Sequence, residues 1–476
     1  MLTIRRDPIP ARLRHHAPTI AIAVVAAIAA VAAGPAVSAA PLVTVGAAAT
    51  VAIWYVVLLH PPLAAYALLA ATPLVVGIDR GAVVPVLRPS ELLLAVLLVP
   101  VLGHLLWSYV ASAPLAVRFR PLDGAIVALA VLSSVVPVLW LLARDQALTT
   151  DDLLYSVALW KYFVVYLLIR LSVTSERHVR TCLAVLLVAA GIVSAVAVLQ
   201  SLGLFGMASL LATHWAPQDV SSALESGRGT STLASSISVG DVMAYSTALA
   251  LAWAIKEPHL RRVLLPAVVL FILGAFASGQ FSGVLALVIA VVATGWVTRT
   301  LRSVVRYAVP VLGLAGLALA PVVMQRLAGF RSGSLPVSWT GRWENLTTFF
   351  WPELFRGFNY LLGVRPSARI VDPNDIFGFV WIESGYTWLL WNGGLPLLAA
   401  FVAFLVVGRR QAFDAVQYGP GTVSVAGVAS VAMLVVVAIM MVLDPHLTLR
   451  GSADMAFALL ALIVPISASW STEDAQ

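Results

Sequence analysis

Continuous apolar blocks, separated by short segments rich in Pro, Gly and charge, recur along the whole chain. Each block has roughly the 17 to 25 residues that a helix needs to cross about 30 Å of hydrocarbon. Only 11% of the residues are charged, whereas a soluble domain has about 25%. Blocks such as AIAVVAAIAAVAA lack the apolar–polar alternation of a membrane-spanning barrel strand. The sequence therefore predicts an all-α, polytopic membrane protein.

We expect about 12 to 14 transmembrane helices in a single transmembrane domain over residues 1–476. The candidate spans are 17–38, 41–59, 62–77, 91–111, 124–142, 155–171, 181–204, 239–255, 263–277, 282–297, 307–324, 383–407, 422–443 and 453–469. The first block has a basic start and is followed by GPAVSAA, as in a signal peptide. Its apolar run of about 20 residues is longer than the usual 7 to 15, so we predict a retained helix.

Charge is distributed unevenly between the predicted sides of the membrane. With the N-terminus inside, short inner segments collect 17 of the 29 basic residues, and 15 of the 22 acidic residues fall on outer segments or their edges. This bias predicts a protein of the cytoplasmic membrane with both termini in the cytoplasm. It also explains the net charge of +7 without a nucleic-acid partner.

Two of the predicted outer segments are long, at residues 205–238 and 325–382. A loop of more than about 12 to 15 residues is usually functional or disordered. The second segment contains WTGRWENLTTFFWPELFRG, whose aromatic side chains and apolar spacing predict a helix lying in the membrane interface. We therefore expect both segments to be functional loops on the outer face.

Arginines gather in the 325–382 segment, against the charge bias of its side. They are Arg326, Arg331, Arg342, Arg356, Arg365 and Arg369. A guanidinium group binds phosphate oxygens through paired hydrogen bonds, so we favour an anion site. Solvated arginines, or arginines bound to lipid headgroups, explain the same pattern. The neighbouring Trp343 suits an interfacial belt or stacking against a sugar ring.

The first loop contains SGRGTSTLASS, in which Arg228 lies between glycines and is followed by hydroxyl side chains. Glycines let the backbone approach a ligand closely, and hydroxyl and amide groups can join the arginine around a phosphate. This pattern predicts a second contribution to the anion site. A solvated turn is the alternative.

Glu383 marks the point where the second loop re-enters the membrane, in GFVWIESGYTWLLWNGG. Desolvation disfavours the charged form of a carboxylate there, which suits a general base near neutral pH. An acid that interacts with the helix macrodipole is the alternative interpretation. Asp372 and Asp375 of VDPNDIFG are alternative bases, or residues of a tight turn.

Lys161 lies about two turns inside a predicted span, where a charged side chain is a functional candidate. We expect it to contribute to substrate binding, or to pair with Asp151 or Asp152. His214 and His446 are isolated in the sequence, so we expect no metal site. No phosphate-cradling P-loop pattern is present, which argues against nucleotide-driven chemistry.

The order of these features resembles the bacterial O-antigen ligase and O-antigen polymerase family. GRGTST, the hairpin ASGQFSGVLALVIA, the arginine-rich loop and ESGYTWLLWNGGLPLLAAF follow one another as in that family. The resemblance covers roughly residues 60–470 and is most specific over residues 225–400. It implies a GT-C-like fold and a metal-independent, inverting glycosyltransferase without a cofactor.

The resemblance also implies substrates, partners and residue roles. The donor would be a glycan linked to a polyprenyl pyrophosphate, the acceptor a glycan or lipid, and the neighbours membrane lipids and envelope polysaccharide assembly proteins. Arg228 and Arg342 match the family's pyrophosphate-binding arginines. Arg331, Arg356, Arg365, Lys161, Tyr386 and Trp343 are further substrate-binding candidates. Glu383 stands where family ligases often have histidine, which favours a polymerase or a relative over a ligase.

Two other classes of function compete with an enzyme. A transporter or lipid-carrier flippase would place polar sites near the middle of the membrane, often with inverted repeats, whereas the polar residues of this chain concentrate in outer loops. A non-enzymatic scaffold of an envelope assembly would tolerate conservative changes at the arginines.

Overall fold

The chain is a multi-pass, all-α membrane protein. The computed structural model describes residues 41–82, 85, 87–110, 119–215, 227–328, 337–372 and 378–464. Within these residues, nine helices are long and apolar enough to cross a membrane, and several apolar helices are shorter. The predicted first span, 17–38, lies outside the described residues. Every other predicted span overlaps a helix or two consecutive helices, and the ends of 91–111 and 453–469 lie outside the described residues.

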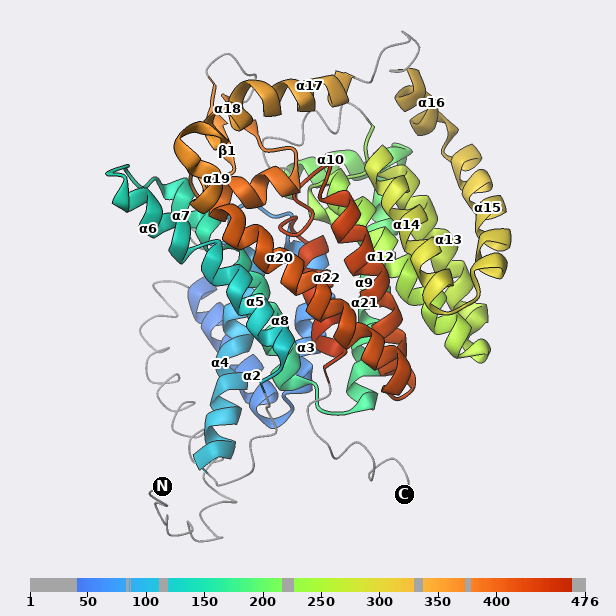
Figure 1. The fold of residues 1–476 in the computed structure, drawn as a ribbon. Helices are drawn as coiled ribbons and strands as arrows, with labels where there is room; N and C mark the ends of the chain where they lie inside the picture. Colours follow the sequence, from blue (N-terminus) through green and yellow to red (C-terminus); the bar gives the residue numbers. More distant parts are fainter. Residues whose placement is uncertain are drawn as a thin grey trace.

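Figure 1 shows the helices side by side as an elongated bundle. The first half of the chain forms α2 (Pro41–Leu59), α3 (Pro62–Val75), α4 (Pro89–Val110), α5 (Pro121–Leu132), α6 (Val135–Ala143), α7 (Thr150–Ser156), α8 (Ala158–Ser172) and α9 (Glu176–Ser201). The second half forms α10 (Met207–His214), α12 (Ser236–Lys256), α13 (Arg261–Ala277), α14 (Phe281–Val297), α15 (Leu301–Ala318), α16 (Ala320–Ala328), α20 (Gly385–Tyr418), α21 (Gly421–Met440) and α22 (Ser452–Leu462).

Helices α12 and α21 form the centre of the bundle. Both are almost entirely buried, and α12 packs against α9, α13, α14 and α21. Small side chains permit this close packing, as expected for helix contacts in membranes. At Gly240, a Cβ atom would lie 2.6 Å from the Cα atom of Gly283, so α12 and α14 approach each other only because both positions are glycine.

The segment between α16 and α20 forms short elements over one end of the bundle, which we call the upper face (top of Figure 1). We call residues 337–382 the upper loop. Its described elements are α17 (Val337–Asn345), a π-helical turn (Leu346–Phe350), α18 (Trp351–Leu354), a 3-10 turn (Arg356–Phe358), α19 (Asn359–Leu362), β1 (Arg369–Val371) and β2 (Phe379–Trp381). The two strands pair antiparallel. The prediction of a partly helical loop is confirmed, while the strand pair was not predicted.

Buried aromatic side chains hold the upper loop on α20. Phe350 is fully buried, and its ring packs edge to face against Trp391 with the centroids 5.2 Å apart. The indole N–H of Trp391 in turn donates to the backbone carbonyl of Ser367 at 2.9 Å. A kink at Gly394, where φ is +65°, brings α20 against the backbone of Leu361. The loop is therefore a packed part of the fold.

Candidate functional site

The start of α20 is docked on the loop between α21 and α22, residues 441–451. Ser384 caps α20, with its hydroxyl oxygen accepting from the backbone N–H of Thr387, and the N–H of Tyr386 donates to the carbonyl of Met441 at 3.2 Å. A Cβ atom at Gly385 would lie 2.4 Å from the sulfur of Met441, so glycine permits the contact. This docking brings Glu383 next to the 441–451 loop.

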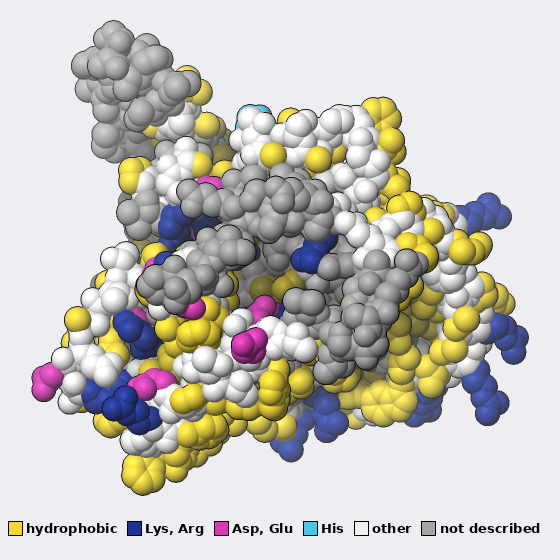
Figure 2. Space-filling view, turned by 90° about the horizontal axis from the view of Figure 1, so that it is seen from above, with side chains coloured by type: hydrophobic (Ala, Val, Ile, Leu, Met, Phe, Trp, Pro, Cys, Tyr) yellow, Lys and Arg dark blue, Asp and Glu magenta, His cyan; other side chains and the backbone are white. Residues whose placement is uncertain are grey.

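Arg342 lies between two carboxylates at this junction. Its Nη2 donates to Oδ2 of Asp444 at 3.0 Å, and its Nε lies 3.7 Å from Oε1 of Glu383. Asn345 is three residues further along α17, on the same helix face, and its amide donates to Oε2 of Glu383 at 3.4 Å. Seen from above, acidic and basic side chains lie next to one another towards the middle of this face (Figure 2).

A buried histidine–aspartate pair extends this group into the bundle. Nδ1 of His446 lies 2.7 Å from Oδ2 of Asp241 in α12, and the two side chains are 0% and 1% exposed. The backbone N–H of His446 donates to the carbonyl of Asp444 at 2.8 Å. We call the six residues Asp241, Arg342, Asn345, Glu383, Asp444 and His446 the Arg342 cluster.

Burial dominates the electrostatics of the Arg342 cluster. It raises the pKa of Glu383, which the charge of Asp444 raises further and the charge of Arg342 partly lowers again. It also raises the pKa of Asp444, against the opposing charges of Arg342 and His446. For His446, burial lowers the pKa, but Asp241 and the charge of Asp444 together raise it more, so the net shift is upward. A carboxylate that titrates closer to neutral pH beside an arginine can accept a proton next to a bound anion.

The structure brings together two of the three predicted catalytic residues, Glu383 and Arg342. Arg228, the third, is partly buried, and the N–H of the following Gly229 donates to the carbonyl of Ala277 at 2.8 Å. The side chain of Arg228 passes close to Gly279. The adjacent Gln280 donates to the hydroxyl of Ser236 at the start of α12, the helix that also carries Asp241. Arg228 thus lies near the start of α12, where Ser236 precedes Asp241 of the same helix by five residues.

Arg365 is engaged by an aspartate of α7. Its Nε and Nη2 donate to the two carboxylate oxygens of Asp152 at 3.0 and 2.6 Å. Arg369 forms a similar pair with Asp151, at 2.5 Å. These two ion pairs fasten the upper loop to the upper end of α7.

Lys161 pairs with Asp454 of α22, with Nζ 2.8 Å from Oδ1. The prediction that Lys161 pairs with Asp151 or Asp152 is wrong, because those aspartates bind Arg369 and Arg365. Tyr386 is half-buried, and its hydroxyl donates to the carbonyl of Ala438 at 2.7 Å.

Two further predicted substrate-binding residues, Arg356 and Trp343, have little contact with the rest of the fold. Arg356 is 80% exposed and lies 3.6 Å from Glu353 of its own turn. Trp343 is 62% exposed and packs edge to face against Trp351. Arg331 lies outside the described residues.

The sequence analysis missed Asp444 and Asp241, and its interpretation of His446 as isolated is wrong. Asp241 interrupts an apolar block, and an acid inside a predicted span is a functional candidate. Asp444 and His446 occur together in the short polar segment Asp-Pro-His between two apolar blocks. Either signal could have directed attention to the 441–451 loop.

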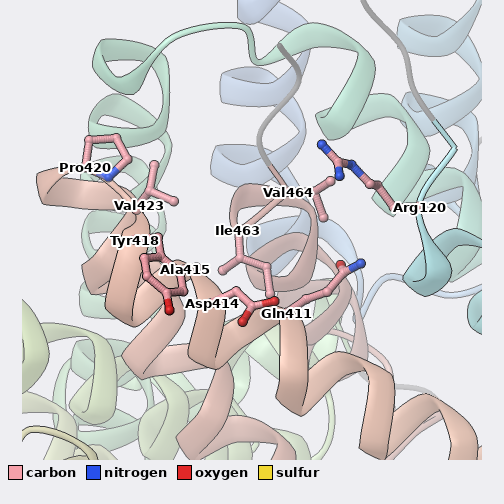
Figure 3. Close-up of a pocket in the computed structure, with 10 residues that line it drawn as sticks. Arg120, Gln411, Asp414, Ala415, Tyr418, Pro420, Val423, Ile463 and Val464 are labelled. Atoms are coloured by element: carbon pink, nitrogen blue, oxygen red, sulfur yellow. The ribbon is translucent and has the colours of Figure 1, made fainter. Parts of the chain in front are cut away.

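A second feature lies at the lower face, the end of the bundle opposite the upper loop. Figure 3 shows a pocket of about 320 Å³ where α20 and α22 end and α5 and α21 begin. Its lining includes Arg120, Gln411, Asp414 and Tyr418. This pocket is at the far end of the helices from Glu383, so it does not belong to the Arg342 cluster.

Among the described residues, no three His, Cys, Asp or Glu side chains are arranged as ligands of a metal ion. No protein-family model and no curated protein matches the chain.

Proposed function

We propose that the protein is a membrane glycosyltransferase that transfers or polymerises a glycan carried on a polyprenyl pyrophosphate. The observation that carries this proposal is Arg342 between Glu383 and Asp444, at the end of the bundle where both long loops lie. This arrangement combines a cation for the departing pyrophosphate, Arg342, with a carboxylate whose pKa is raised by burial, Glu383. The family resemblance of residues 225–400 points to the same chemistry.

In the proposed reaction, Glu383 accepts the proton of an acceptor hydroxyl while the hydroxyl oxygen attacks the anomeric carbon of the donor sugar. The bond between that carbon and the pyrophosphate oxygen breaks, and the pyrophosphate leaves with the electron pair. Arg342 and Arg228 stabilise the charge that develops on it. Glu383 then returns its proton to water. Asp444 is a positioning residue, because it holds the guanidinium group of Arg342 through two contacts, at 3.0 and 3.3 Å.

The proposal also includes an orientation in the membrane and a fold. The upper face would be the outer face of the cytoplasmic membrane, which agrees with the basic inner segments of the sequence. The bundle with a large loop over one end would be a GT-C-like fold. Glu383 in the position of the ligase histidine favours a polymerase of envelope or extracellular polysaccharide.

Arg342→Lys tests the proposal, since lysine keeps the charge but loses the two-pronged hydrogen bonding of arginine. We expect glycan transfer to a lipid-linked acceptor to fall on the order of 100-fold or more. Arg302→Lys, at an exposed arginine of α15 on the lower face, is the matched control and should retain full activity. Normal polymer from well-expressed Arg342→Lys protein would refute the assignment. Single repeat units that accumulate on the carrier after deletion of the gene would identify a polymerase, and finished polymer on the carrier a ligase.

A lipid-carrier flippase is the second candidate, because the Asp241–His446 pair places titratable groups inside the bundle, as in proton-coupled transporters. Liposomes that contain the purified protein and a labelled lipid carrier separate the two functions. An enzyme extends the glycan without moving the carrier between leaflets, whereas a flippase moves the carrier without extending it.

A further inference from the structure

A second group of basic side chains lies around the buried Tyr162 of α8. Arg88 directly precedes α4, Arg450 precedes α22 by two residues, and Lys161 is next to Tyr162. Arg80 belongs to the same α3–α4 connection as Arg88. We call Arg80, Arg88, Lys161 and Arg450 the Arg88 cluster. None of its members belongs to the Arg342 cluster.

Two members of the Arg88 cluster have acidic partners. Arg80 lies 2.8 Å from Glu91, and Lys161 lies 2.8 Å from Asp454. The other two differ. Among the described residues, Nε and Nη1 of Arg88 and Nη1 of Arg450 are buried without a hydrogen-bond acceptor. A buried N–H group without an acceptor costs about 1 to 3 kcal/mol, and more when the group is charged. The fold therefore maintains unfilled donors at these two arginines.

Tyr162 connects Arg88 with Arg450. Arg88 interacts electrostatically with Tyr162 and with Arg80. The hydroxyl of Tyr162 donates to the carbonyl of Thr448 at 2.9 Å, two residues before Arg450. Helix α8 packs against both α4 and α22. The two arginines, far apart in the sequence, are thus brought to the same part of the bundle, near Tyr162.

The charges around Arg88 favour an anion. Burial lowers the pKa of Arg88, and the neighbouring charge of Arg80 lowers it further, while Glu91 and Asp79 only partly offset these effects. Glu91 is engaged by Arg80 and by the backbone N–H of Arg88. A bound anion would supply both the missing negative charge and the missing acceptors.

We propose that Arg88 and Arg450 form a binding site for a phosphate or diphosphate group that shares no residue with the Arg342 cluster. Phosphate oxygens match guanidinium forks and can accept from two arginines at once. Arg88 directly precedes α4, which is long enough to span a membrane, and Arg450 precedes the shorter helix α22. The phosphate group would belong to a membrane lipid or to a free phosphate compound. The site would exist whether or not the protein transfers glycans.

The test measures thermal unfolding of the full-length protein with inorganic pyrophosphate. It uses the Arg342→Lys background, which weakens pyrophosphate binding at the transfer site. We expect pyrophosphate to raise Tm, and Arg88→Met and Arg450→Met each to weaken its Kd about 10- to 100-fold. Without pyrophosphate, Arg88→Met should raise Tm, because it removes two buried N–H groups that have no acceptor. Arg302→Met on the lower face is the control, with unchanged Kd.

In a second arm, no pyrophosphate is added, and the protein is placed in nanodiscs. Nanodiscs that contain phosphatidylglycerol are compared with nanodiscs of phosphatidylcholine alone. A rise in Tm in both arms identifies a lipid headgroup as a ligand, and a rise with pyrophosphate only identifies a free phosphate compound. Both results support the site. The proposal is overturned if neither ligand raises Tm, or if Arg88→Met and Arg450→Met bind like the parent. If Arg88→Met does not fold, Arg88→Lys and Arg450→Gln give the same comparison. All these outcomes would be the same if the protein did not transfer glycans.

Discussion

Arg365 and Arg342 both project from the upper loop towards carboxylates, yet their surroundings differ. Arg365 binds one carboxylate, Asp152, through both prongs of its guanidinium group, and Asp152 accepts five hydrogen bonds in total. Arg342 is shared by Glu383 and Asp444, and its Nε is buried without a hydrogen-bond acceptor. The first arrangement is saturated and fixes the loop. The second retains hydrogen-bonding capacity for a ligand.

The carboxylates Asp152 and Glu383 also differ in burial, and this difference agrees with a structural role for the first and a chemical role for the second. Asp152 is fully buried, and its oxygens are engaged by Arg365, Ser367 and Thr149. Glu383 is 33% exposed, so a substrate hydroxyl can reach it. Saturated ion pairs in a fold stabilise it or specify its geometry, whereas accessible carboxylates with raised pKa are candidates for chemistry. Changes at the two places should therefore affect different properties of the protein.

The largest effect is expected for Glu383→Gln. Glutamine keeps the shape and can still accept from Asn345, but it cannot take a proton, and a general base contributes on the order of 10²- to 10⁴-fold to a rate. Turnover should fall by that factor, while binding of the lipid-linked donor and Tm change little. Steady-state kinetics with a lipid-linked donor, together with Tm, checks this. A variant with near-normal turnover, or one that loses activity only because it unfolds, would remove Glu383 from the proposed role.

Asp152→Ala should lower the stability and leave the turnover nearly unchanged, the opposite of Glu383→Gln. It leaves Arg365 and the N–H groups of Ser367 and Thr149 without their acceptor, and breaking such a pair costs about 3 kcal/mol or more. We expect a clearly lower Tm and a protease-sensitive upper loop, with near-normal activity per folded molecule. Arg365→Gln should give a smaller decrease in Tm, because Arg365 is 31% exposed and water replaces part of the interaction. If Asp152→Ala instead abolished activity at unchanged Tm, Arg365 would belong with Arg342.

The helices could be predicted from the sequence, because a membrane span requires an unbroken apolar block that is visible in one dimension. The pairing of charges could not. Arg365 and Asp152 are distant in the sequence, and nothing local distinguishes Arg365 from Arg342. Only the packing of the upper loop on α7 and on the 441–451 loop decides which arginine meets a saturated carboxylate. Glu383 could be chosen as a candidate from the sequence, because its position where an apolar block begins is itself a sequence feature.

The smallest expected effect is a displacement of the pH profile by Asp444→Asn. Burial and the charge of Asp444 raise the pKa of Glu383, and the base works only when deprotonated. Activity should therefore rise with pH through this raised pKa, above the range near pH 4.3 where an exposed glutamate titrates. Asparagine removes the negative neighbour but can still accept from Arg342, so the pKa of Glu383 falls and the acid limb of the profile moves to lower pH. Glutamine at position 383 should abolish that limb, which gives the control. An acid limb that stays in place in Asp444→Asn would mean that Asp444 only holds Arg342, and that burial alone sets the pKa of the base.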